Sequence, residues 1–271
     1  MSAVTTCLKT HNIMNKNIIA IINQKGGVGK TTTSINFAAG LANKNYRVLL
    51  IDLDPQAHST IGLGIEPETF QASIGDVLAK KQPIKNAILS TATENLFIVP
   101  SHIRLDKIEQ QLTPELFRET FLYKAIQNLT YDFIVIDCRP TLSTLTINAL
   151  YASNFIIVPC EMGRYALDGF ADLMETIDHV KNGDMDKSQF IRILLTKYDS
   201  RNKVSNDWVL QQLEPFQSLI FRAYIRRNEA INQSQMAQET IFTFKPDSTG
   251  AQDYATLTNE FLNLWHQLET N

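Results

Sequence analysis

The sequence predicts an α/β fold, namely a doubly wound, mainly parallel sheet with helices on both faces. Seven short β-rich runs punctuate the chain, and most are continuous apolar runs, which is typical of strands buried on both faces. Stretches with helical periodicity lie between these runs, and strands that alternate with helices imply βαβ crossovers. The length of 271 residues is enough for one large domain with its own core.

Each element follows from its own residue pattern. The predicted strands are Ile18–Asn23, Val48–Asp54, Leu96–Pro100, Phe133–Cys138, Phe155–Pro159, Ile191–Thr196 and Ile220–Ile225. The predicted helices, each with apolar residues at helical spacing, are Thr31–Asn43, Leu116–Leu129, Asp168–Val180 and Tyr254–Leu268. The stretch Glu66–Thr93 predicts short helices with turns. No repeat or Pro/Gly/Ser-rich linker divides the chain, so we expect residues 1–16 to be a flexible tail and residues 17–271 to form a single domain.

Composition excludes several classes of protein. With 44% apolar and 20% charged residues the chain is not a disordered one, and a net charge of −3 excludes a globally basic nucleic-acid coat. The three cysteines, Cys7, Cys138 and Cys160, are too widely spaced for a disulfide framework or a CxxC metal site, which favours a reducing cytosol. The five histidines are dispersed, so none is a credible metal ligand. The longest apolar runs are only as long as a strand, which is too short to span a bilayer.

The strongest motif is the glycine-rich run Asn23–Thr32, which reads NQKGGVGKTT between the first strand and the first helix. Glycines let several backbone N–H groups point inward, and the helix N-terminus adds partial positive charge, so the run predicts a phosphate-binding loop. Lys30 would reach the β- and γ-phosphates, the Thr31 hydroxyl would ligate Mg²⁺, and Thr32 would contact the α-phosphate. The predicted nucleotide-binding residues of the loop are Lys25, Gly26, Gly27, Val28, Gly29, Lys30, Thr31 and Thr32.

The loop departs from the common G-x-x-x-x-G-K-[ST] form, because Gln24 replaces the first glycine and Lys25 adds a second lysine. In this it resembles the deviant Walker A loop of the ParA/MinD group of P-loop ATPases, and most closely the ParA/Soj branch of partition proteins. The resemblance covers about residues 17 to 265. It implies an ATPase that binds ATP and Mg²⁺ and forms a sandwich homodimer, in which Lys25 reaches the partner's ATP.

Two further strands end in carboxylates, where the ligand crevice of a parallel sheet is expected. Asp52 and Asp54 end one strand, and Asp137 ends another. Asp137 fits a Walker B strand, whose carboxylate holds Mg²⁺ together with Thr31. The family resemblance implies that Asp54 orients the hydrolytic water and that Asp52 supports the Mg²⁺ shell or the loop.

Several positions differ from the family pattern. Arg139 stands where the first of two prolines is usual, and it would either steady γ-phosphate charge or point at solvent. In the segment Val158–Gly169, which resembles the family's switch, Glu161 and Gly163 replace the usual Gln and Glu. Arg226 replaces a proline near the expected base pocket, so the effects of these four residues on the cycle stay open.

The choice between ATP and GTP also stays open at this level. The run Leu194–Asp199 resembles the family's strand near the base pocket, but it also matches the TKxD box by which many GTPases read guanine. The deviant phosphate loop favours ATP.

The charge pattern suggests a DNA-binding face. Residues 192–227 contain seven basic and three acidic residues, so this segment carries +4 and the rest of the chain −7. A local basic patch on an acidic protein favours contacts to phosphates. In the family, nucleotide-bound dimers bind DNA without sequence preference through this part of the chain, which here offers Arg201, Arg226 and Arg227.

The resemblance implies a bacterial cytoplasmic protein associated with the nucleoid, with a ParB-like centromere-binding partner that accelerates hydrolysis. One alternative is a MinD-like membrane-associated ATPase, which needs a C-terminal amphipathic helix with a basic face. Residues 251–271 contain no Lys or Arg, so we expect no stable membrane anchoring. A second alternative is a nucleotide-switch adaptor that does not hydrolyse its nucleotide, and the sequence leaves turnover, cargo and plasmid or chromosomal origin open.

Overall fold

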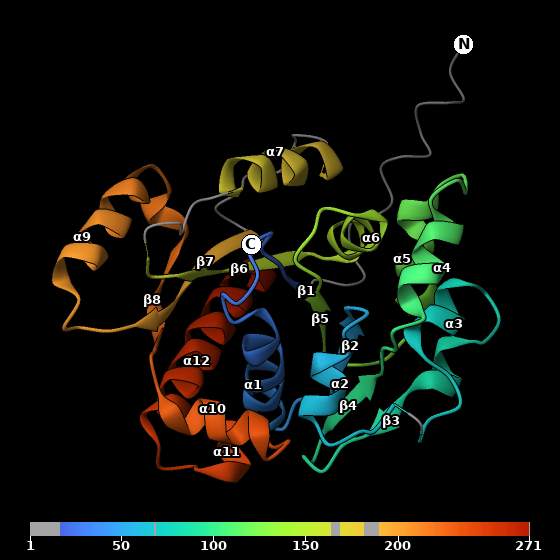
Figure 1. Cartoon of the computed structure of the whole chain (residues 1–271), viewed down its shortest axis with the longest axis horizontal. Coiled ribbons are helices and arrows are strands. Elements are labelled where there is room, and N and C mark those ends of the chain that lie inside the picture. Colours follow the sequence, from blue (N-terminus) through green and yellow to red (C-terminus); the bar gives the residue numbers. More distant parts are fainter. Residues whose placement is uncertain (1–16, 68, 164–168, 182–189, 271) are drawn as a thin grey trace.

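The computed structural model of the chain describes residues 17–67, 69–163, 169–181 and 190–270. In this part of the chain, eight strands form one sheet in the order β3-β4-β2-β5-β1-β6-β7-β8 (Figure 1). All neighbours pair in parallel except β3 and β4. The strands are β1 Ile18–Ile21, β2 Val48–Leu53, β3 Leu89–Ser90, β4 Leu96–Val99, β5 Phe133–Cys138, β6 Phe155–Glu161, β7 Ile191–Tyr198 and β8 Ile220–Arg226.

Helices cover both faces of this sheet, so the predicted α/β fold is confirmed. One face carries the helices α1 Lys30–Ala42, α10 Glu229–Met236, α11 Ile241–Phe244 and α12 Thr249–Thr270. The other face carries α3 Ile74–Leu78, α4 Leu105–Leu112, α5 Phe121–Ile126, α6 Thr144–Ala152, α7 Phe170–Val180 and α9 Lys203–Gln212. The remaining elements are α2 His58–Gly62 and the 3₁₀ turns η1 Ile84–Ala87, η2 Arg118–Thr120 and η3 Glu214–Leu219.

Alternate residues of the central strands bury into different cores. In β1, Ile18 and Ala20 belong to the core under α5, α6 and α7, whereas Ile19 and Ile21 belong to the core under α1 and α12. Each central strand is therefore apolar over most of its length, because both of its faces are covered. This packing explains why the strands appear in the sequence as continuous apolar runs.

The predicted helix Leu116–Leu129 is wrong in extent. A regular helix begins only at Phe121 and ends at Ile126, after the short turn η2. Leu116 and Phe117 are 81% and 70% exposed, and Phe117 has a φ of +57°, a left-handed conformation that an α-helix does not contain. Two apolar side chains that stay in solvent therefore extended the apparent helical stripe beyond the helix itself.

Several elements were not predicted, namely β3, the helices α2, α4, α6, α9, α10 and α11, and the turn η3. The two-residue strand β3 pairs antiparallel with β4 at the edge of the sheet, inside the stretch expected to hold short helices and turns. The helix α4 follows β4 in a stretch where no helix was expected. Its apolar residues Leu105, Ile108 and Leu112 stand at helical spacing, so a signal for this eight-residue helix was present in the sequence.

The C-terminal helix α12 packs against the sheet and α1 through its apolar stripe. Phe261 packs edge to face with Phe37 and Phe133, at 5.0 and 5.7 Å between ring centroids, and the ring centroid of Trp265 lies 4.8 Å from that of Phe133. Leu257 and Phe261 are fully buried. The stripe is thus used within the fold, and among the described residues no helix is long and apolar enough to cross a membrane.

Candidate nucleotide site

The site lies at the carboxyl edge of the three central strands β1, β2 and β5. The pairing of β2 with β5 sets Asp52 directly opposite Asp137, and the pairing of β1 with β5 sets Ile21 opposite Asp137. The loop that leaves β1 therefore emerges beside both carboxylates. Parallel pairing thus brings together three sequence segments that lie up to 116 residues apart along the chain.

The loop between β1 and α1 has the shape of a phosphate cradle. Gly27 and Gly29 have φ values of +76° and +91°, which side-chain-bearing residues rarely adopt. A Cβ atom placed at Gly26 or Gly27 would meet nothing within 4 Å, so the space above the loop is open. Helix α1 begins at Lys30, and the N–H groups of its first turn have no partners within the helix. These features fit a bound phosphate chain.

Hydrogen bonds from neighbouring strands hold the loop in this shape. The Asn23 amide donates to the Pro159 carbonyl at 2.7 Å, and its oxygen accepts the N–H of Lys25 at 2.9 Å. The Thr196 hydroxyl donates to the Val28 carbonyl at 2.8 Å. Val28, predicted as a loop residue, is itself fully buried, so only its backbone faces the cradle. Asn23 and Thr196 were not predicted as site residues, although polar ends of buried strands are the signal that would have found them.

Lys30 folds back over the loop that it follows. Its ammonium donates to the Lys25 carbonyl at 2.8 Å, and the residue is only 7% exposed. Burial lowers the pKa of Lys30, and the negative charges of Asp137 and Asp54 partly oppose this shift. Electrostatic attraction is stronger in a buried site than in water. A bound phosphate would therefore stabilise the charged form of Lys30 strongly.

Asp137 lies at the centre of the site and is fully buried. Its two oxygens accept the hydroxyls of Ser34 at 2.9 Å and Ser59 at 2.7 Å. Burial raises the pKa of Asp137, and hydrogen bonds from the Ser59, Ser34 and Thr31 hydroxyls oppose the rise. Thr31 and Asp137, the two predicted metal ligands, are therefore neighbours, whereas Ser34 and Ser59 were not predicted.

The donor atoms at this point suit Mg²⁺. A threonine hydroxyl and a carboxylate are hard oxygen ligands, and Mg²⁺ is usually held by one or two carboxylates with substrate phosphates and water. Across residues 17–67, 69–163, 169–181 and 190–270 there is no cluster of three or more His, Cys, Asp or Glu side chains arranged to hold a metal. The arrangement matches a cation that arrives with a nucleotide.

Asp52 organises the connection that follows β2. One of its oxygens accepts both the N–H and the hydroxyl of Thr60, at 2.8 and 2.7 Å, and the other accepts the N–H of Asp54 at 3.2 Å. Thr60 in turn accepts the N–H of Ser101 at 3.0 Å, which ties α2 to the end of β4. Burial, followed by the charge of Asp137, raises the pKa of Asp52. Of its two predicted roles, the structure therefore favours support of the polypeptide, and a contact of Asp52 with nucleotide stays a prediction.

Asp54 lies at the mouth of the site, two residues beyond Asp52. It is 8% exposed, and one oxygen accepts the N–H of Gln56 at 2.9 Å. Its charge influences Lys30, Asp137 and the Cys138 thiol, which places it on the phosphate side of the cradle. This is a suitable position for a group that orients a water molecule.

Lys25, the additional lysine of the loop, does not point into its own cradle. Its ammonium lies 4.0 Å from a carboxylate oxygen of Glu161, and the other Glu161 oxygen lies 3.3 Å from the ammonium of Lys197. The Lys25 side chain is 27% exposed. Glu161, one of the departures from the family pattern, thus sits between two lysines. Of the segment expected to act as a switch, residues 164–168 lie outside the described residues.

A pocket of about 340 Å³ continues the cradle on the side away from the carboxylates. Its described lining is Gly29, Thr32, Thr196, Lys197, Ile225, Arg226, Arg227, Asn228, Glu229, Ile231, Asn232 and Tyr254. It begins at the phosphate loop and is the right place for a nucleoside. Arg226, which replaces the family's proline, forms part of this wall and is held there by a two-pronged pair with Asp253, with contacts of 2.6 to 3.0 Å.

The TKxD resemblance to guanine-reading proteins is not supported by the geometry. Asp199 would have to face the base, but it is not part of the described pocket wall. Its carboxylate instead receives two hydrogen bonds from the Arg201 side chain, at 2.9 and 2.7 Å. These bonds lower the pKa of Asp199 to about 2. This carboxylate is therefore already engaged, and the geometry favours ATP.

Arg139 neither faces the phosphate site nor points freely at solvent. Its guanidinium contacts Asp106 at 2.9 Å and Glu109 at 2.6 Å, both on α4. Glu109 also accepts the N–H of Leu145 at the start of α6. Arg139 therefore joins the end of β5 to α4 and α6. The sequence could not show this, because it did not predict α4.

The fold and the site together define a nucleoside-triphosphate-binding P-loop protein with a second lysine in its loop. Comparison with known proteins narrows this class to a family. A family model described as an AAA domain matches residues 16–191. The chain is 38% identical over 245 residues to the sporulation initiation inhibitor protein Soj of Bacillus subtilis, covering 90% of this chain and 97% of that one. It is 37% identical over 247 residues to the chromosome partitioning protein ParA of Myxococcus xanthus, covering 90% and 87%.

A solved structure agrees with these relatives. Cobyrinic acid a,c-diamide synthase from Mycobacterium smegmatis, with bound ADP and magnesium, superposes with a TM-score of 0.79 at 31% identity, covering 92% of this chain and 95% of that one. The chain belongs to the ParA/Soj family of partition ATPases. It is accordingly an ATPase, which places it among nucleotide-hydrolysing enzymes rather than adaptors.

Proposed function

We propose that this ATPase segregates a plasmid or chromosome in the bacterial cytoplasm, through a dimer that ATP and Mg²⁺ assemble. Two chains close face to face over two nucleotides, the dimer binds nucleoid DNA without sequence preference, and hydrolysis returns it to the free state. A ParB-like centromere-binding protein accelerates the hydrolysis. The observation that carries the proposal is the contrast between two loop lysines: Lys30 is buried over its own cradle, whereas Lys25 is partly exposed and faces away from it.

Each part of the site has a role in this cycle. Lys30 and the loop N–H groups bind the phosphates of the chain's own nucleotide, and Lys25 of the opposite chain adds positive charge to them. Thr31 and Asp137 would hold Mg²⁺, which would supply charge neutralisation for the phosphates. Asp54 orients the attacking water, while Ser34, Ser59 and Asp52 keep the carboxylates and the β2–α2 connection in place.

The experiment that tests the proposal measures dimerisation and DNA binding together. The purified protein is examined with ATP, with ADP and without nucleotide, always with Mg²⁺, across a salt series. We expect dimers and binding to unrelated duplexes of equal length only with ATP, with an affinity that falls steeply as salt rises because phosphate contacts release counterions. A chain that stays monomeric with saturating ATP, or that binds DNA equally well in every nucleotide state, would contradict the proposal.

The cations of the basic segment differ in their surroundings. Arg201 and Arg226 have carboxylate partners in Asp199 and Asp253, whereas Arg227 is exposed and makes no ion pair with a described carboxylate. Both Arg226 and Arg227 also line the nucleoside pocket. Because its charge is not paired with a described carboxylate, we infer that Arg227 contributes more to DNA affinity than Arg201 or Arg226.

Replacing Arg227 with alanine should weaken DNA binding equally for all sequences. Each dimer loses two phosphate contacts, so the slope of log affinity against log salt should fall by about 2. Titration of a labelled duplex with the ATP-bound protein at several salt concentrations measures this slope. Lys44→Ala, on the exposed turn after α1, is the matched control and should leave the slope unchanged. An unaltered slope for Arg227→Ala would remove this residue from the DNA face.

Replacing Glu161 with glutamine should strengthen ATP-dependent dimerisation. Glu161 attracts Lys25 within its own chain and so competes with the phosphates across the dimer. Partly exposed ion pairs contribute about 0.2–1 kcal/mol each, and the dimer contains two of them, so dimer affinity should rise by up to about 30-fold. Sedimentation of a dilution series in ATP measures the change. Glu94→Gln, on the exposed turn before β4, should have no such effect, and weaker dimerisation of Glu161→Gln would reverse our interpretation.

A further inference from the structure

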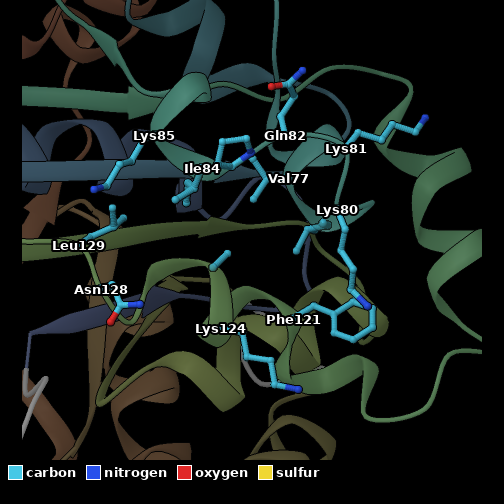
Figure 2. A pocket seen from close by; sticks show the side chains of 13 residues that line it. Val77, Lys80, Lys81, Gln82, Ile84, Lys85, Phe121, Lys124, Asn128 and Leu129 are labelled. Carbon is cyan, nitrogen blue, oxygen red and sulfur yellow. The ribbon is translucent and has the colours of Figure 1, made fainter.

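A pocket remote from the nucleotide site opens between the turn that joins α3 to η1 and the helix α5. Its volume is about 590 Å³. None of its described lining residues belongs to the phosphate loop or to the nucleoside pocket. The floor is apolar and includes Val77, Leu78, Ile84, Phe121 and Leu129. Figure 2 shows Val77, Ile84, Leu129 and Phe121 among the lysine and amide side chains that surround the pocket.

The rim of this pocket is strongly basic. Lys80, Lys81, Lys85 and Lys124 line it, and no Asp or Glu is among its described lining residues. None of the four ammonium groups forms an ion pair with a described carboxylate, although the whole chain carries a net charge of −3. Figure 2 shows Lys85 and Lys80 on different sides of the pocket, with Lys124 extending from the α5 side.

Local structure sets part of this rim in place. Lys80 has a φ of +57°, in the left-handed region that ends α3 and starts the turn toward η1. Its ammonium lies 4.2 Å from the centroid of the Phe121 ring, close enough for a cation–π interaction. The Lys80 ammonium therefore covers one face of the Phe121 ring.

A second hollow, of about 400 Å³, continues the pocket toward the sheet edge and shares Lys85, Asn128 and Leu129 with it. It adds Arg47, whose guanidinium lies 5.0 Å from the Tyr131 ring centroid and 5.7 Å from that of Phe97. Neither hollow has an acidic residue in its described lining. Together they form one groove with cations along its length, which we call the lysine groove.

The chemistry of the groove selects its occupant. The apolar floor complements large apolar side chains, and the cationic rim complements carboxylates. A chain segment that carries large apolar side chains between carboxylates would therefore fit the groove. Duplex DNA fits less well, because its phosphates contact exposed convex cations and cannot reach an apolar floor. Residues 1–16 of this chain also fit poorly, since they include Lys9 and Lys16 but no Asp or Glu.

We propose that the lysine groove docks an acidic segment of a partner protein, with at least one large apolar side chain of that segment seated between Ile84 and Phe121. This function is separate from nucleotide binding. The same protein could then hold DNA and a protein partner on different surfaces, since the groove shares no residue with segment 192–227.

The test uses three fluorescently labelled peptides of about twelve residues. The first alternates Glu or Asp with Leu, the second replaces Leu by Ser, and the third replaces the acidic residues by Lys. Fluorescence anisotropy with the full chain should show binding of the first peptide, at least about fivefold weaker binding of the second and none of the third. Raising salt from about 50 to 200 mM should weaken the first complex, as expected for rim charges.

Charge reversal locates the binding site. The double variant Lys80→Glu/Lys124→Glu should lower the affinity for the first peptide by about tenfold or more, whereas Lys44→Glu should leave it unchanged. ATP turnover should stay at the parent rate in all of these variants, because none touches the nucleotide site. Circular dichroism on heating checks that each variant folds, and Lys85→Glu alone serves as the substitute should the double variant fail to fold.

Three results would overturn the proposal. They are the absence of binding by the acidic Leu peptide, equal affinity of parent and charge-reversed protein for that peptide, and competition by a single- or double-stranded oligonucleotide whose own binding depends on Lys80 and Lys124. The last result would make the groove a nucleic-acid contact instead of a protein-docking surface.

Discussion

Replacing Asp54 with asparagine is expected to slow ATP hydrolysis by about 10²- to 10⁴-fold while ATP binding stays within about twofold of the parent value. The asparagine oxygen can still accept the N–H of Gln56, so the local backbone is retained. What is lost is the negative charge that orients and polarises the attacking water. Because the phosphates are held by the loop and Lys30 instead, the variant should accumulate as an ATP-bound dimer on DNA.

Phosphate release measures the rate of ATP hydrolysis, and the binding of a fluorescent ATP analogue measures the affinity for the nucleotide. Asp207→Asn, on the exposed face of α9, changes the same charge far from the site and serves as the matched control. Hydrolysis by Asp54→Asn at more than about a tenth of the parent rate would exclude Asp54 as the residue that orients the water. Loss of ATP binding would instead indicate that Asp54 supports the cradle.

Replacing Lys25 with alanine is expected to abolish ATP-dependent dimerisation and leave the binding of ATP to the single chain intact. A lysine that pairs with a phosphate in a closed interface contributes about 2–5 kcal/mol, so the dimer dissociation constant should rise by about 30-fold or more. Among the described residues, the ion pair of the Lys25 ammonium is a long contact with Glu161, so its loss should cost little folding stability.

Analytical ultracentrifugation with ATP, and with ADP for comparison, measures this constant. Lys30→Ala provides the contrasting variant, because removing the lysine buried over the chain's own cradle should prevent nucleotide binding itself. Lys44→Ala should behave as the parent. If Lys25→Ala forms dimers at the parent concentration in ATP, the sandwich arrangement is wrong for this chain, although its membership of the family is unaffected.

Local patterns predicted a large share of this molecule. The loop from Asn23 to Thr32 was recognisable because glycine positions, a lysine and two threonines must stand at defined spacings to surround a phosphate. The central strands were recognisable because both faces are buried, which leaves an uninterrupted apolar run. The start of α1 was predicted to within one residue, and β5 with both of its ends, for the same reasons.

Other features depend on contacts between distant segments. Ser34 and Ser59 are common residues on two different helices, and only parallel pairing of the strands brings both to Asp137. Arg139 acquires its partners from α4, which lies about 30 residues earlier in the chain and was not predicted. The Leu116–Phe117 pair misled the prediction, because exposure is a property of the fold and not of the side chain.

The sequence by itself determined the fold class, the phosphate loop with its two lysines, and the carboxylates at the ends of two strands. The tertiary structure alone decided what those groups face: Lys30 its own cradle, Lys25 the carboxylate of Glu161, and Asp137 the hydroxyls of Ser34 and Ser59. It alone also revealed the lysine groove, whose cations come from separate elements. The physical reason is that backbone conformation and burial follow from neighbours in the chain, whereas the pairing of charges depends on distances between residues that folding brings together.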